Sequence, residues 1–151
     1  MRAIVPDVAH ALFGAVFLFT SLLIADTHTD VIDVCAGMAA ALSDHNVSEF
    51  MKNFDKDMPA YDTLKNQIQA LMVGADLTSS IEPIKDEGDE AKRTADFDWY
   101  LQIRSQYPTG PIVNRREIIH CELRKQGKQG KHWKIVSLQP MEFFAPPPLD
   151  K

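Results

Sequence analysis

Alternation of hydrophobic and polar residues dominates the last third of the chain, residues 112–144. Apolar and polar side chains mostly alternate up to Arg124, although Ile118 interrupts the alternation. Residues 126–130 (Gln-Gly-Lys-Gln-Gly) have the composition of a turn, and residues 132–138 return with a second apolar run. A period of two residues on both sides of a glycine-containing turn is typical of an antiparallel β-hairpin. We therefore predict two long paired strands here.

Two earlier segments show the same alternation. Residues 77–84 are predicted to form a strand at the edge of a sheet, because Pro83 lacks the N–H that an interior strand donates. A polar turn is predicted at 85–89, and residues 91–106 then form a long strand with apolar and polar faces. A turn at 107–111 leads into the terminal hairpin. The strands therefore follow one another as a meander of about four strands.

Helical spacing replaces the alternation in the first half of the chain. The first predicted helix opens at Thr29–Asp30, and its apolar residues recur every three or four positions along one face. A shorter helix covers residues 47–54. A third begins near Pro59, which suits the first turn of a helix, and ends at Gly74. Three helices followed by an antiparallel sheet predict an α+β fold, with the helices packed on one face of the sheet.

The first 25 residues are predicted to be a separate segment. A basic residue, Arg2, precedes an uncharged run over residues 8–25, and Asp26 ends that run. As a helix the run would extend roughly 27 Å, close to the ~30 Å hydrocarbon core of a membrane. We interpret residues 1–25 as a signal peptide or an uncleaved membrane anchor. A buried N-terminal helix is the alternative.

Length and composition are those of one globular domain. The chain has 151 residues, of which 45% are hydrophobic and 25% charged, and this balance is ordinary for a folded domain. We place the domain at residues 26–145, followed by a proline-rich tail at 146–151. On this interpretation the protein is secreted or periplasmic, and it contacts a membrane only through residues 1–25 if these are not cleaved.

Charge is distributed unevenly along the chain. The net charge is −5, yet basic residues outnumber acidic ones from Arg115 to Lys134. Such a hairpin could contact phosphate backbones. Trp133 is the only aromatic residue among these charges, so a surface for stacking bases is missing. We expect a solvated hairpin with lysines near a sheet edge, and no nucleic-acid partner.

This order of elements resembles the nuclear transport factor 2-like superfamily, which includes ketosteroid isomerase and the SnoaL-like polyketide cyclases. The resemblance spans residues 30–144, and the residues that carry it most clearly are Trp133, Ile135, Leu138 and the pair Phe54–Asp55. It implies a cone, in which a strongly curved sheet wraps round the first helix, with the three helices on its concave face and a pocket at its wide mouth. It also implies a homodimer through the outer sheet face.

The resemblance directs attention to three acid–base candidates. Enzymatic members carry an acidic residue on a short strand after the second helix. Here Asp55 and Asp57 occupy a polar corner that passes straight into a helix, and a general base usually needs burial to reach a suitable pKa. We favour turn formation for both. His120 could point into the cone, although its apolar neighbours favour an outward position. No catalytic residue is assigned.

Aromatic residues offer a lining for the implied pocket. Phe54, Tyr61, Trp99 and Trp133 could line it together with His120, or could instead fill the core. No ligand spacing typical of zinc and no nucleotide-binding motif is present, so we predict no metal and no cofactor.

The two cysteines, Cys35 and Cys121, occupy apolar positions. We interpret both as buried thiols, and a disulfide between them stays open if the chain is exported.

These observations favour a non-catalytic, homodimeric domain that binds a small apolar molecule. An isomerase- or dehydratase-like enzyme and a pure dimerisation domain are the alternatives.

Overall fold

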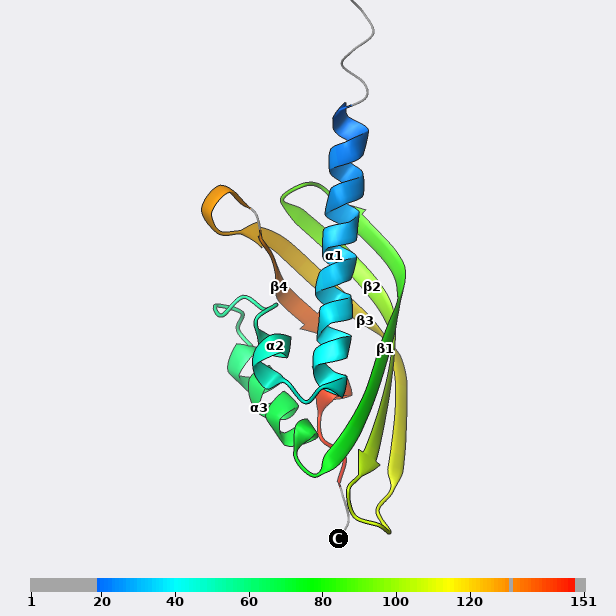
Figure 1. The fold of residues 1–151 in the computed structure, drawn as a ribbon. Coiled ribbons are helices and arrows are strands. Elements are labelled where there is room, and N and C mark those ends of the chain that lie inside the picture. Colours follow the sequence, from blue (N-terminus) through cyan, green and yellow to red (C-terminus); the bar gives the residue numbers. More distant parts are fainter. Residues whose placement is uncertain (1–18, 131, 149–151) are drawn as a thin grey trace, which may run out of the picture.

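The computed structural model describes residues 19–130 and 132–148 (Figure 1). Three α-helices precede four strands, and two short 3₁₀ helices, η1 and η2, flank the last strand. The elements are α1 (Phe19–Ser43), α2 (Val47–Met51), α3 (Tyr61–Met72), β1 (Ala75–Gly88), β2 (Lys92–Ser105), β3 (Ile112–Gln126), η1 (Lys128–Gly130), β4 (His132–Gln139) and η2 (Met141–Phe144). The helices pack on the concave face of the curved sheet, which confirms the predicted α+β fold (Figure 1).

The sheet is the predicted meander. Its strand order is β1-β2-β3-β4, and all neighbours are antiparallel. Pro83 lies on the edge strand β1, beside a register shift between Pro83 and Lys85. The predicted turn at 85–89 is wrong for most of its length, because pairing with β2 resumes after the shift and continues to Gly88. The bulge accommodates the proline without ending the strand.

The first helix begins earlier than predicted. α1 starts at Phe19, not at Thr29, and it runs through the proposed boundary between residues 25 and 26. No proline or glycine separates Phe19 from Asp30, so nothing in this stretch interrupts helical hydrogen bonding. Most of the predicted signal peptide, residues 1–18, lies outside the described residues, so export stays a prediction. Within the described part of the chain, no helix combines the length and hydrophobicity of a membrane span.

The two shorter helices differ slightly from their predicted bounds. α2 ends at Met51, so Phe54 lies outside it and forms an isolated parallel bridge with Ile135 of β4. α3 begins at Tyr61, after Pro59, and ends before Gly74, whose φ of +73° is the left-handed conformation typical of a helix C-terminus.

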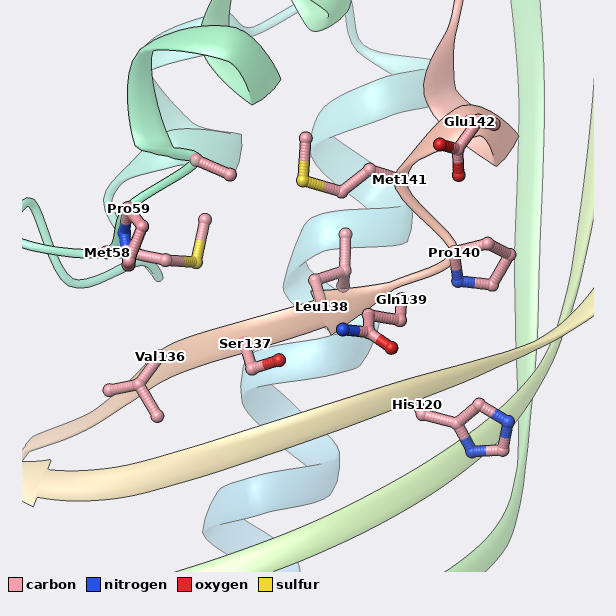
Figure 2. A pocket seen from close by; sticks show the side chains of 11 residues that line it. Met58, Pro59, His120, Val136, Ser137, Leu138, Gln139, Pro140, Met141 and Glu142 are labelled. Carbon is pink, nitrogen blue, oxygen red and sulfur yellow. The ribbon is translucent and has the colours of Figure 1, made fainter.

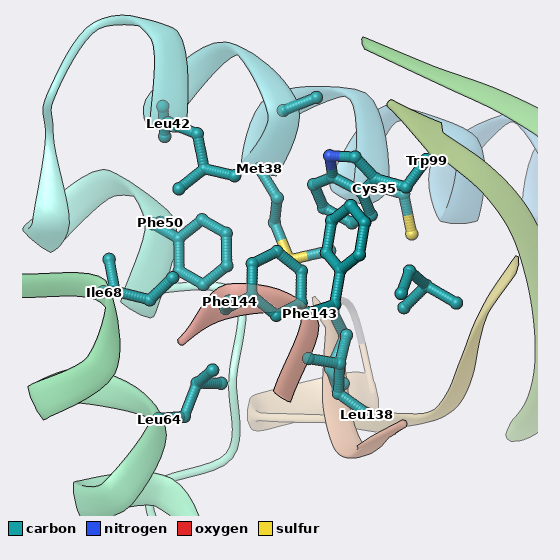
Figure 3. Packing of buried hydrophobic residues seen from close by; sticks show 14 of the residues in the cluster. Cys35, Met38, Leu42, Phe50, Leu64, Ile68, Trp99, Leu138, Phe143 and Phe144 are labelled. Carbon is teal, nitrogen blue, oxygen red and sulfur yellow. The ribbon is translucent and has the colours of Figure 1, made fainter. Parts of the chain in front are cut away.

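Aromatic side chains from the C-terminal end fill the hollow of the sheet. Phe143 and Phe144 of η2 are buried, and their ring centroids lie 5.0 Å apart. The Phe144 ring also packs against Trp99 of β2 and Phe50 of α2, with ring centroids 5.2 Å and 5.8 Å apart, respectively (Figure 3). The Arg115 guanidinium donates hydrogen bonds to the carbonyl oxygens of Phe143 at 2.7 Å and Ala145 at 2.5 Å. η2 is therefore part of the core.

If η2 completes the core, removing one of its rings should destabilise the whole domain. Phe144→Ala should lower the free energy of unfolding by about 3–5 kcal/mol, because a fully buried phenylalanine is replaced by a cavity. Tyr107, which is 56% exposed, provides a control, and Tyr107→Ala should change stability by at most about 0.5 kcal/mol. Urea unfolding followed by circular dichroism measures both values. Equal, small losses in the two variants would contradict a core role for η2.

Candidate functional site

An apolar groove lies between the corner before α3 and the C-terminal end of β4 (Figure 2). Its volume is about 730 Å³. Three segments line it: the corner Met58–Ala60, residues 136–139 of β4, and Pro140 with the first two residues of η2. His120 of β3 completes the rim. We name this hollow the Met58–Met141 groove.

Local irregularities of the backbone shape this groove. The pairing of β3 with β4 shifts between Glu122 and Leu123: Leu123 pairs with Ile135 and Glu122 with Ser137, so Val136 is left without a partner. A β-bulge of this kind redirects side chains at a sheet edge. Val136 is half-buried and lines the groove. The Met58 and Met141 side chains point toward one another across it (Figure 2).

The structure distributes the five predicted pocket residues over three places. His120 lies at the rim of the groove, while Phe54 and Tyr61 line a second hollow between α2, α3 and the β3–β4 hairpin. Trp99 and Trp133 are buried, with 0% and 4% of their surface exposed. The indole N–H of Trp99 donates to Ser79 Oγ at 2.8 Å. Both tryptophans thus fill the hydrophobic core.

His120 lies on the outer face of the sheet. Its side chain is 61% exposed, and its neighbours in β3, Ile119 and Cys121, are buried on the opposite face. Its Nδ1 atom lies 2.7 Å from Asp96 Oδ1, on the residue paired with it in β2. The imidazole therefore reaches the groove from the rim and does not enter the cone.

Asp55 follows a short β-like contact that the sequence analysis missed. Its N–H donates to Ile135 O at 2.9 Å, and the Ile135 N–H donates to Asn53 O at 2.8 Å. The chain therefore does not pass straight from α2 into α3, because residues 53–55 first run beside β4. No local periodicity indicates so short a contact.

The Asp55 carboxylate has a structural set of hydrogen bonds. It accepts the N–H of Asp57 at 2.9 Å and the side-chain amide of Gln126. These bonds, in that order, lower the pKa of Asp55. A general base at neutral pH needs a raised pKa, so the environment of Asp55 favours turn formation. Asp57 is exposed in the same corner.

Metal-binding and thiol chemistry find little support in the described residues. Among them, no group of three or more His, Cys, Asp or Glu residues is arranged to hold a metal ion. Cys35 and Cys121 are free and buried. The hydrogen bond between them, followed by burial, raises the pKa of the Cys35 thiol. A raised pKa leaves little reactive thiolate at neutral pH.

Sequence reasoning missed Met58, Met141 and Glu142 as lining residues. They come from segments far apart in the chain, and none of them belongs to a periodic pattern. The only local signal was the presence of Pro59 and Pro140, which indicates irregular backbone in the two segments that form walls of the groove.

The sequence matches no protein-family model and no curated protein. Solved structures match over most of their length. A candidate scytalone dehydratase from Novosphingobium aromaticivorans has a TM-score of 0.68 at 11% identity, covering 78% of this chain and 85% of that one. A cystatin-like-fold, nuclear transport factor 2-like protein from the same organism has a TM-score of 0.65 at 12% identity, covering 85% and 89%.

A nuclear transport factor 2-like superfamily protein from Salmonella enterica matches with a TM-score of 0.63 at 11% identity, covering 76% of this chain and 89% of that one. This chain has the nuclear transport factor 2-like fold. The resemblance noted in the sequence is thereby confirmed at the level of fold. One fold can host unrelated activities, so function must be argued from the site.

The hydrogen bonds of Asp55 predict how its carboxyl titrates. In Gln126→Ala the pKa of Asp55 should rise toward that of an ordinary aspartate, because the carboxylate loses a donor. Since the pKa of Asp55 is lowered on folding, its stabilising contribution is present above the unfolded pKa and is lost as pH falls through the folded pKa. The variant should therefore lose less stability on acidification than the wild type.

Carboxyl-detected NMR titration measures the pKa directly. Gln106→Ala is the matched control, because Gln106 bonds Asp76 instead, and it should leave the titration of Asp55 unchanged. An unchanged Asp55 titration in Gln126→Ala would show that the contact does not hold the carboxylate in solution.

Proposed function

We propose that this protein is a non-catalytic domain that binds a small apolar molecule in the Met58–Met141 groove. The observation that carries the proposal is an apolar hollow of about 730 Å³, within the range of roughly 300–1,000 Å³ typical of ligand pockets. Its polar lining residues in the described part of the chain are few: His120, Ser137, Gln139 and Glu142. Such groups can orient a ligand whose body rests on the apolar walls.

The chemistry of the walls favours a ligand of variable shape. Met58 is buried and Met141 is half-buried, and both thioethers extend into the groove (Figure 2). Unbranched, polarisable methionine side chains adapt to different apolar surfaces. Leu138 supplies the floor and is 2% exposed. A flat or aliphatic molecule would therefore find a deformable apolar surface here.

Acid–base catalysis at the rim is the second candidate. The Asp96 carboxylate lies 2.7 Å from His120 Nδ1, an arrangement that orients an imidazole for proton transfer. One structural neighbour is a candidate scytalone dehydratase. Against this candidate, His120 is 61% exposed and no other acid or base of the described residues except Glu142 lines the groove. Turnover that disappears in His120→Asn while binding persists would support the enzyme.

The groove predicts where an uncharged fluorescent probe binds. Val136→Lys should weaken Nile red binding by about tenfold or more, because an ammonium group then stands among apolar walls. Val73→Lys is the matched control: Val73 is 72% exposed and does not line the groove, so binding should change by less than about twofold. Fluorescence titration of the full chain measures both affinities. Equal affinities in the two variants would place the probe elsewhere and overturn the proposal.

We further propose that the outer sheet face forms a homodimer. On this face Asp98 accepts a two-pronged hydrogen bond from Arg116, with Nη2 to Oδ2 at 2.7 Å, so its charges are already paired within one chain. Beside them Ile118 is 47% exposed. Satisfied charges around an exposed apolar residue suit contact with a second copy.

The dimer can be tested by one substitution on this face. Ile118→Asp should convert a dimer into a monomer, because an unpaired carboxylate would be buried at the interface. Val73→Asp introduces the same charge away from the outer face and should leave the dimer intact. Sedimentation velocity distinguishes the states. A wild-type chain that stays monomeric at high concentration would refute the dimer.

A further inference from the structure

A second hollow of about 750 Å³ lies between α2, α3 and the β3–β4 hairpin. It shares no lining residue with the Met58–Met141 groove. We name it the lysine cleft, because lysines from four different places in the sequence surround it. These are Lys52, Lys56, Lys65 and Lys134.

The cleft has a positive charge balance in an acidic protein. The whole chain carries a net charge of −5, whereas Asp55 is the only carboxylate among the described residues that line the cleft. The Asp55 carboxylate already accepts bonds from Asp57 and Gln126, so much of its hydrogen-bonding capacity is used. A local excess of ammonium groups attracts anions and raises their concentration at the site.

Two of the four lysines are committed to other contacts and two are free. Lys52 pairs with Glu49, and Lys134 donates to the carbonyl oxygen of Lys52. Lys56 and Lys65 are exposed and form no ion pair within the described residues. Both line the cleft, and they come from separate segments, the corner after α2 and helix α3. Their ammonium groups are therefore available to an anionic group bound between them.

The inner wall of the cleft is apolar. Met51 and Phe54 are 4% and 2% exposed. The Phe54 ring stacks on Phe50, with the ring centroids 5.4 Å apart. Val47 and Tyr61 are half-buried and pack against the same cluster. A ligand that places an anion between the lysines can therefore rest an apolar group on this wall.

We propose that the lysine cleft binds an amphipathic anion, namely a carboxylate or phosphate group attached to an apolar chain or ring. Lys56 and Lys65 bind the anionic group, and the wall formed by Val47, Met51 and Tyr61 contacts the apolar part. Nucleic acid is disfavoured as the ligand, because the aromatic residues among the described lining are Phe54 and Tyr61 and Phe54 is only 2% exposed, whereas successive bases need a series of exposed rings to stack on.

The probes separate the two halves of the ligand. Octyl phosphate carries both halves, inorganic phosphate only the charge, and octanol only the chain. Isothermal titration calorimetry of the full chain should show octyl phosphate, below its micelle concentration, binding at least about tenfold more tightly than either fragment. Affinity should fall as salt is added, because exposed charges are screened. Equal affinity for inorganic phosphate and octyl phosphate would overturn the amphipathic assignment.

Two double variants that remove the same amount of charge, one inside the cleft and one outside it, test where the ligand binds. The double variant Lys56→Gln/Lys65→Gln should lose about tenfold or more in affinity for octyl phosphate. The control Lys85→Gln/Lys92→Gln removes the same charge from exposed positions on β1 and β2, outside the cleft, and should bind as the wild type does. Lys56→Arg/Lys65→Arg should retain binding, which guards against a folding defect. Equal losses in the test and control variants would refute the site.

Three binding measurements distinguish the possible sources of the anion. Binding of monomeric octyl phosphate that depends on Lys56 and Lys65 indicates a free small molecule. Binding only to phosphatidylglycerol vesicles, with the same dependence, indicates a lipid headgroup. Tighter binding of a single-stranded oligonucleotide, with the same dependence, would overturn the proposal in favour of nucleic acid. None of these outcomes depends on Nile red binding in the groove.

Discussion

The packing of η2 into the hollow of the sheet is the interaction on which the rest of the structure depends. A curved four-stranded sheet leaves an apolar concavity that one helix cannot fill. Phe144 contacts α2 through Phe50 and β2 through Trp99, so a single ring joins the helical layer to the sheet. A buried aromatic side chain removes about 150–250 Å² from water, worth roughly 4–6 kcal/mol before entropic costs. The interior of the cone is consequently core, and its hollows lie at the periphery.

Two arginines, Arg115 half-buried and Arg93 buried, fix the ends of this arrangement. Arg115 faces the concave side opposite Leu101 and binds the carbonyl groups at the end of η2; desolvation lowers its pKa. Arg93 is buried on β2, and its Nε donates to Asp86 Oδ1 on β1 at 2.6 Å. The other Asp86 oxygen lies 2.5 Å from His28 Nδ1 on α1. Buried charges must be paired to be tolerated, so both contacts hold the elements in register.

Local hydrophobic periodicity predicted the longer helices and the strands. It failed for residues whose position is set by contacts with distant parts of the chain. Strict alternation placed Phe97 and Trp99 on one face, and both are buried on β2. The same rule could not place Arg115. This polar residue faces inward, where its guanidinium donates hydrogen bonds to carbonyl oxygens at the end of η2. η2 has only four residues, too few for a periodic signal. The fold was therefore predictable, whereas the filling of the cone was not.

The residues proposed for the site show the same division. Phe54 and Tyr61 were predicted to line the pocket of the cone, and the structure places them at the lysine cleft instead. The walls of both hollows depend on contacts between distant segments, such as the bridge of Phe54 to Ile135. No pairing of these residues is visible in a single sequence, because neither propensity nor spacing encodes a contact made across some eighty positions.

The corner between α2 and α3 links the two hollows. Its first half, with Lys52 and Lys56, lines the lysine cleft, and its second half, Met58–Ala60, lines the groove. Asp55 belongs to the first half and binds three separate parts of the structure: its backbone bonds β4, and its carboxylate bonds the corner itself and the end of β3. Hydrogen bonds to an ionised acceptor are stronger than those between neutral groups. The Asp55 carboxylate therefore serves to fix the geometry of both walls. Its lowered pKa is a consequence of these hydrogen bonds, whereas a general base needs a raised pKa.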